Sequence, residues 1–154
     1  MDKKVKDLNG KIFQISDSKT KFKFVLFWNS FSPPAIIAFD ELNKKRIELQ
    51  KKDVEVFGLI PESKYLNSNR KIKINTEAIE QDKKAAIRFN RKFKVKFQSG
   101  FLEDEKILDE LKVNVVPQIW ILTSDGNVFK KFIGYTLNET FDLLFKTIDD
   151  ISKK

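Results

Sequence analysis

The chain is organised around five consecutive apolar residues at 24–28, which predict a strand covered on both faces of a sheet. Two polar residues end this run. Pro33 and Pro34 follow shortly after, and they favour the first turn of a helix, where a missing N–H costs little. The pattern therefore predicts a strand, a short turn and a helix over about 33–51.

The rest of the chain alternates between strand-like and helix-like patterns. A largely β-branched segment predicts a strand at 54–60, which would be joined to the first strand by a parallel crossover. Turn signals lie at Asn9-Gly10 and at 124–127, whereas Pro61 to Thr76 is polar and predicts a loop. Other apolar stretches predict strands at 12–15, 118–123 and 128–133, and amphipathic stretches predict helices at 77–92, 104–112 and 137–151. This order predicts a single α/β domain over 1–154, with a central mixed sheet and helices on both faces.

The composition supports a folded domain and removes several kinds of chemistry. A chain of 154 residues with 41% hydrophobic residues and 15 phenylalanines can bury a core. It has no cysteine, which excludes thiol catalysis, disulfides and thiolate metal sites, and no histidine, which excludes the usual general base. The sequence accordingly predicts no metal site and no cofactor.

The charge is strongly basic and unevenly distributed. The formal net charge is +8, and no acidic residue occurs between Lys83 and Leu102. The cations of this segment are Lys83, Lys84, Arg88, Arg91, Lys92, Lys94 and Lys96. They fit an exposed, solvated helix face, and they also fit a contact with phosphate groups. A basic module that binds nucleic acid or anionic lipid therefore stays open as one hypothesis.

Two segments resemble the thioredoxin-like superfamily, most closely its TlpA/ResA and peroxiredoxin-related branch. The first, Phe27-Trp28-Asn29-Ser30-Phe31, matches the lead-in to a Cys-Pro-Pro-Cys motif, which here reads Ser-Pro-Pro-Ala. The second is Val116-Pro117, followed by an apolar strand and an Asp-Gly turn. The resemblance covers about Lys6 to Ser152. It implies the thioredoxin fold, with a cis Val116-Pro117 bond beside the Ser32 turn.

The resemblance also shows what this chain lacks. Ser32 stands where the family has its nucleophilic cysteine, and Ala35 stands where it has the resolving cysteine. Leu26 stands where many members carry a buried Asp or Asn. A serine hydroxyl cannot exchange with a disulfide, so the dithiol reaction is excluded for this sequence. Either a redox enzyme lost its chemistry by descent, or the two cysteines of an active thiol–disulfide oxidoreductase were replaced.

In the family, the turn, the helix start and the cis-proline loop form a groove that receives an extended peptide. The matching residues here are Phe31, Ser32, Pro33, Pro34, Ile36, Val116 and Pro117. The resemblance thus implies a peptide or protein partner at a groove between Ser32 and Pro117. Alternatively, Ile36 and Ile37 only fill a gap under a neighbouring loop.

The compartment is not fixed by the sequence. No apolar run reaches the roughly 18 residues that a membrane helix needs, and no signal peptide is visible. The family resemblance favours an extracytoplasmic or periplasmic location, with a signal or anchor removed, while a cytoplasmic location stays open.

Overall fold

The apolar run forms most of β3 (Phe22–Phe27), the middle strand of a five-stranded sheet. The structure is a computed structural model that describes residues 4–62, 76–103 and 105–152. The other elements are β1 (Val5–Lys6), β2 (Ile12–Phe13), a 3-10 helix (Ile15–Asp17), α1 (Pro33–Lys51), β4 (Val54–Pro61), α2 (Thr76–Lys92), β5 (Gln98–Leu102), α3 (Glu105–Leu111), β6 (Gln118–Thr123), β7 (Val128–Ile133) and α4 (Glu139–Ser152). None of the described helices is both long and apolar enough to cross a membrane.

The sheet has the order β5-β4-β3-β6-β7 and is mixed, as predicted. β3, β4 and β5 run parallel, while β6 pairs antiparallel with β3 and with β7. The unit β3-α1-β4 is the expected parallel crossover. The hairpin turn between β6 and β7 is also confirmed, because Gly126 has a φ of +87° and its N–H bonds to the Thr123 carbonyl at 2.9 Å.

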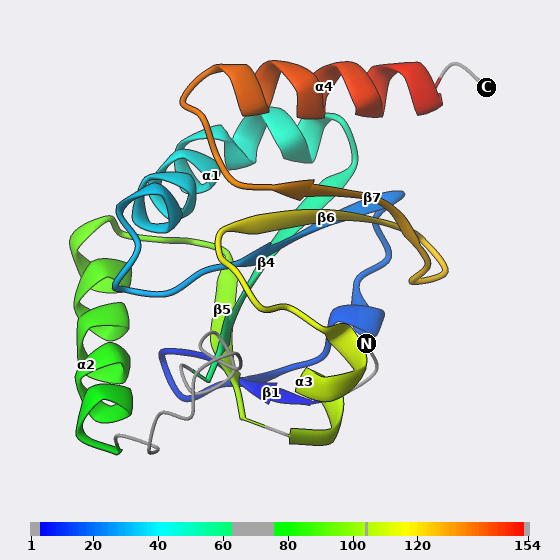
Figure 1. Cartoon of the computed structure of the whole chain (residues 1–154). Helices are drawn as coiled ribbons and strands as arrows, with labels where there is room; N and C mark the ends of the chain where they lie inside the picture. The colour runs from blue at the N-terminus through cyan, green and yellow to red at the C-terminus, as the bar shows by residue number, and fades with distance from the viewer. Residues whose placement is uncertain (1–3, 63–75, 104, 153–154) are drawn as a thin grey trace.

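Alternating side chains of β3 belong to two hydrophobic layers, one on each face of the sheet. Phe24 and Leu26 lie in the layer that α1 and α4 cover, whereas Val25 and Phe27 lie in the opposite layer. The N-terminal hairpin and α3 contribute to that second layer, and Figure 1 shows α3 and β1 across the sheet from α1 and α4. Helices therefore cover both faces, as the pattern predicts.

Several predicted boundaries were wrong or incomplete. The strand predicted at 12–15 ends at Phe13, pairs with β1 outside the main sheet, and gives way to a 3-10 helix at Ile15. α4 begins at Glu139, which leaves Leu137 exposed rather than on the inner side of the helix. The loop predicted from Pro61 to Thr76 falls largely outside the described residues.

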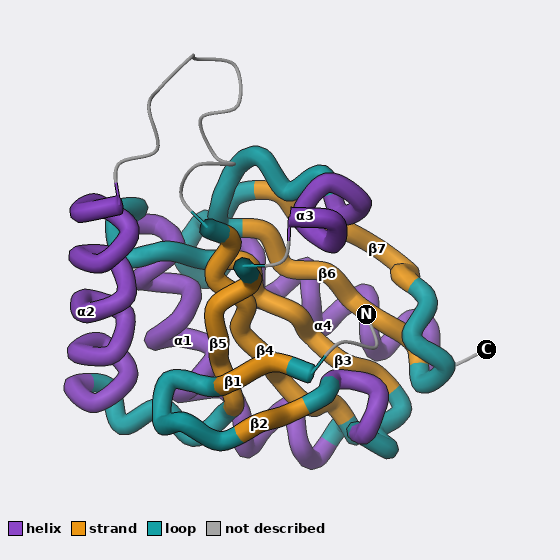
Figure 2. The backbone as a smooth tube through the Cα atoms, turned by 90° about the horizontal axis from the view of Figure 1, so that it is seen from below, coloured by secondary structure: helices purple, strands orange, loops and turns teal. Residues whose placement is uncertain are grey.

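The strand pattern of the sequence does not predict β5, because its Gln-Ser-Gly start has low strand propensity. The strand forms by parallel pairing with β4, from the Phe57–Gln98 pair to the Pro61–Leu102 pair. A Cβ at Gly100 would lie 2.5 Å from the Lys6 carbonyl oxygen, so a glycine is required where the N-terminal hairpin crosses the strand. Figure 2 shows β1 lying beside β5, and Asp7 forms a bridge with Gly100.

Candidate functional site

The two segments that carry the family resemblance meet at one end of the sheet. β3 and β6 are antiparallel and Phe27 is paired with Gln118, so the chain leaves β3 where it enters β6. The turn after Phe27 and the loop before Gln118 are therefore neighbours. The Val116-Pro117 bond is cis, as the resemblance implies.

Asn29 shapes the turn that leads into α1. Its side chain is buried, and its Oδ1 accepts hydrogen bonds from the backbone N–H groups of Phe31 at 3.1 Å and Ser32 at 2.9 Å. Ser32 is the N-cap residue of α1, yet its hydroxyl makes no capping hydrogen bond. The side chain of Asn29, and not that of Ser32, thus organises the start of the helix.

A buried carboxylate on α2 holds the same turn from the other side. Asp82 is 4% exposed, and its Oδ1 accepts hydrogen bonds from the Ser30 backbone N–H at 3.0 Å and from the Ser30 hydroxyl at 2.5 Å. Sequence reasoning missed this residue, because the contact joins positions 52 apart in the chain. The turn is therefore fixed by two side chains before any ligand arrives.

We expect Asp82→Ala to lower the free energy of unfolding by about 1.5–3 kcal/mol, because two donors lose a charged acceptor. Asp149→Ala is the matched control. Asp149 pairs with Lys52 at the surface, where an ion pair contributes only about 0–1 kcal/mol. Urea titration measures both changes, and hydrogen exchange should accelerate at Ser30 only in the Asp82 variant. Equal losses in the two variants would contradict the role of Asp82.

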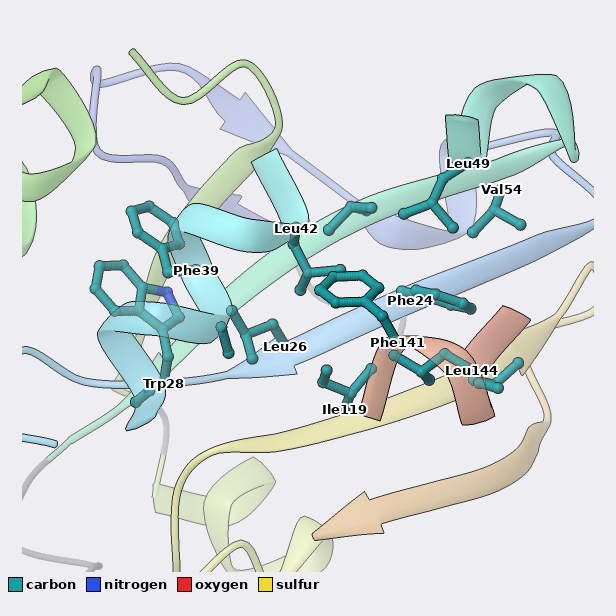
Figure 3. Packing of buried hydrophobic residues seen from close by; sticks show 14 of the residues in the cluster. Phe24, Leu26, Trp28, Phe39, Leu42, Leu49, Val54, Ile119, Phe141 and Leu144 are labelled. Carbon is teal, nitrogen blue, oxygen red and sulfur yellow. The ribbon is translucent and has the colours of Figure 1, made fainter. Parts of the chain in front are cut away.

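Trp28 anchors the turn to the core. Its ring stacks on Phe39 with centroids 3.8 Å apart, and its indole N–H donates to the Ser99 hydroxyl at 2.9 Å. Figure 3 shows the two rings together beside Leu26. Gly58 makes room for this arrangement, because a Cβ there would lie 2.5 Å from the Ser99 Oγ.

The positions that correspond to the redox chemistry are apolar or inert. Ala35 is fully buried in the first turn of α1, and Ser32 is half-buried. Leu26 is also fully buried, within the hydrophobic layer under α1. The core beneath the turn is thus filled by hydrocarbon at the position where the resemblance implies a polar group.

The predicted groove residues differ in exposure. Phe31 is 53% exposed, Pro33 and Pro34 are exposed, and Ile36 and Val116 are half-buried. Pro117 is buried, so its ring can support a groove only from beneath.

Sequence reasoning also passed over two exposed apolar side chains at this end. Ile37, which it considered only as filling, is 45% exposed, and Val115 is 47% exposed. An apolar residue two positions before the family's proline is the signal that would have indicated Val115. Neither residue belongs to a hydrophobic cluster of the described chain.

Fold and site together define a thioredoxin-fold protein of the kind that includes the thiol–disulfide oxidoreductases. The model of the AhpC/TSA family matches residues 1–131, which is most of the chain. The chain therefore belongs to the AhpC/TSA family, and its relatives place it in the TlpA/ResA branch of the thioredoxin-like superfamily.

The curated relatives are similar along nearly the whole chain. This chain is 23% identical over 138 residues to a thiol-disulfide oxidoreductase ResA from Bacillus cereus, and the match covers 90% of this chain and 69% of the relative. It is 25% identical over 144 residues to the protein of the same name from Bacillus anthracis, covering 94% of this chain and 73% of the relative.

Solved structures share the fold at low identity. A putative thiol:disulfide interchange protein DsbE from Chlorobium tepidum superposes with a TM-score of 0.69 at 15% identity, covering 96% of this chain and 93% of the other. A secreted disulfide oxidoreductase from Mycobacterium tuberculosis gives a TM-score of 0.69 at 17% identity, covering 97% and 96%. The similarity in fold therefore extends over the whole domain.

Proposed function

We propose that this protein uses the thioredoxin-fold site to bind an extended peptide segment of a partner, without thiol–disulfide exchange. The observation that carries the proposal is the exposed Phe31 at a turn whose two redox positions, Ser32 and Ala35, hold no sulfur. The occupant is taken to be an extended chain because the apolar residues come from a turn and a neighbouring loop, which together favour a strip rather than a deep pocket.

The chemistry of the site argues against turnover. A serine hydroxyl is far less acidic than a thiol, and activating it requires a general base. The sequence contains no histidine, and position 35 offers only a buried methyl group. Replacement of two cysteines alone would not account for the buried Leu26, so loss of the chemistry by descent is the better explanation.

The rigidity of the turn supports a binding role. Asn29 and Asp82 hold the turn around Phe31 through three hydrogen bonds from backbone N–H groups and one from the Ser30 hydroxyl. A side chain presented from an ordered turn loses less conformational entropy when it binds, and aromatic side chains of this kind often dominate binding energy. Phe31 is therefore proposed as the anchor residue of the interface.

A selection from a library of random twelve-residue peptides on phage tests the proposal. We expect selected peptides to bind the wild-type protein and to lose about tenfold in affinity to Phe31→Ala, because a central aromatic anchor is typically worth 1–2 kcal/mol or more. Phe129→Ala is the matched control, because Phe129 on β7 is 51% exposed but lies on the edge strand. Failure to select any peptide above a bead control, or equal binding to both variants, would contradict the proposal.

An extracytoplasmic location forms part of the same proposal. It is supported by the TlpA/ResA relationship and by the solved relative from Mycobacterium tuberculosis, which is described as secreted. Fractionation of the producing cells tests it, and recovery of the protein solely with the cytosolic marker would argue against it.

A further inference from the structure

One face of α2 carries three cations that no carboxylate of the described residues neutralises. Lys84, Arg88 and Arg91 are exposed and lie at positions i, i+4 and i+7, which places them along one side of the helix over about 10 Å. Among the described residues, none of the three forms an ion pair. The preceding residue behaves differently, because Lys83 pairs with Glu103 at 2.6 Å, and this hydrogen bond raises the pKa of Lys83.

These three cations border an open pocket that reaches the turn of the candidate site. The pocket has a volume of about 690 Å³, and its lining includes Ser30 and Phe31 besides the cations. Asp82 of the same helix is buried, and its carboxylate accepts hydrogen bonds from Ser30. The three positive charges are therefore placed beside the proposed aromatic anchor, and none of the described residues that line the pocket is acidic.

We propose that this pocket binds acidic side chains of the partner peptide, so that the partner is an acidic segment with an apolar residue for Phe31. The inference rests on the proposed function and names the chemical class of its ligand. Two arginine side chains can each hold a carboxylate through paired hydrogen bonds. An extended chain advances about 3.3 Å per residue, and alternate side chains lie on the same face. The row of three cations, about 10 Å long, is therefore long enough to contact two acidic residues that are separated by one other residue.

The pocket is better suited to a peptide than to nucleic acid. Binding of single strands relies on several aromatic platforms along a cationic groove. Phe31 is the single aromatic residue among the described residues that line the pocket, whereas Phe89 and Phe93 of the α2 region stack on each other against the core. One anchor with three cations matches a short acidic segment.

The test compares peptide selections on four proteins. They are the wild type, the pocket variant Arg88→Glu/Arg91→Glu, the control variant Lys92→Glu/Lys146→Glu, and Phe31→Ala. Lys92 and Lys146 are exposed and do not line the pocket, so the control variant has the same change in net charge as the pocket variant. The probe is a phage library of random twelve-residue peptides at physiological salt, and the readout is the frequency of Asp and Glu among selected peptides.

We expect Asp and Glu to be enriched by about threefold or more on the wild type and on the control variant, but not on the pocket variant. Equal enrichment on both charge variants would mean general attraction to a basic protein and would overturn the proposal. Peptides that depend on Phe31 but carry no excess of acidic residues would overturn the binding of acidic side chains by this pocket, while leaving the proposed function standing. If no peptide is selected at all, the proposed function fails with it. Displacement of selected peptides by an oligothymidine strand at the same salt would assign the pocket to nucleic acid and also overturn the proposal.

Discussion

The double substitution Ser32→Cys and Ala35→Cys is expected to create a thiol pair that forms an intramolecular disulfide. Position 32 is the half-buried N-cap of α1, and position 35 lies in its first turn, the spacing at which the family carries its two cysteines. The positive end of the helix dipole should lower the pKa of the thiol introduced at position 32 from about 8.5 to 7 or below. A thiolate would then be present at neutral pH.

Two measurements check this expectation. Equilibration with a glutathione redox buffer reports whether the thiols pair, and the pH dependence of alkylation reports the thiol pKa. Ser124→Cys is the matched control, because Ser124 lies in the exposed turn between β6 and β7 and its thiol should keep an ordinary pKa. If the two thiols fail to pair under oxidising conditions, the turn geometry no longer supports the family reaction.

Turnover of the double variant should nevertheless be weak. No carboxylate or amide lies at position 26, where Leu26 is fully buried in the hydrophobic layer. Adding Leu26→Asp should speed proton transfer to the buried thiol, at a cost in stability of several kcal/mol from burying a carboxyl group. Insulin reduction measures the rate. A double variant that is already fully active would show that this position does not limit the reaction.

Truncation of Trp28 to alanine is expected to cause a large loss of stability, about 3–5 kcal/mol in the free energy of unfolding. The side chain is fully buried, stacks on Phe39, and donates its N–H to Ser99. The substitution removes the stacking, the burial and the hydrogen bond together, and it leaves a cavity beneath the turn. Because the turn begins directly after Trp28, peptide binding should fall as well.

Two milder variants separate these contributions. Ser99→Ala removes only the hydrogen-bond acceptor and leaves the buried indole N–H of Trp28 without a partner, which should cost about 1–3 kcal/mol. Trp28→Phe keeps a ring that can stack on Phe39. Its loss of stability should lie between those of Ser99→Ala and Trp28→Ala. Urea unfolding of the three variants measures the order of their stabilities. A Trp28→Ala protein as stable as Ser99→Ala would contradict the anchoring role of the ring.

Much of the fold followed from local sequence. The apolar run at 24–28, the proline pair at the start of α1 and the Asp-Gly turn between β6 and β7 each impose their structure on adjacent residues. Backbone preferences and the burial of one short stretch act within a few positions, so one sequence suffices to recognise them. The resemblance added the cis Val116-Pro117 bond and the family.

The surroundings of the site required the tertiary structure. Gly100 is required because the N-terminal hairpin lies against β5, Asp82 reaches Ser30 from a helix 52 positions further along, and Pro117 is buried. From the sequence, the cations of α2 fitted either a solvated helix face or a binding surface. The tertiary structure adds that three of them lie beside Phe31. Such contacts depend on the order of strands in the sheet and on which helix faces meet, and no local pattern of charge or hydrophobicity encodes either.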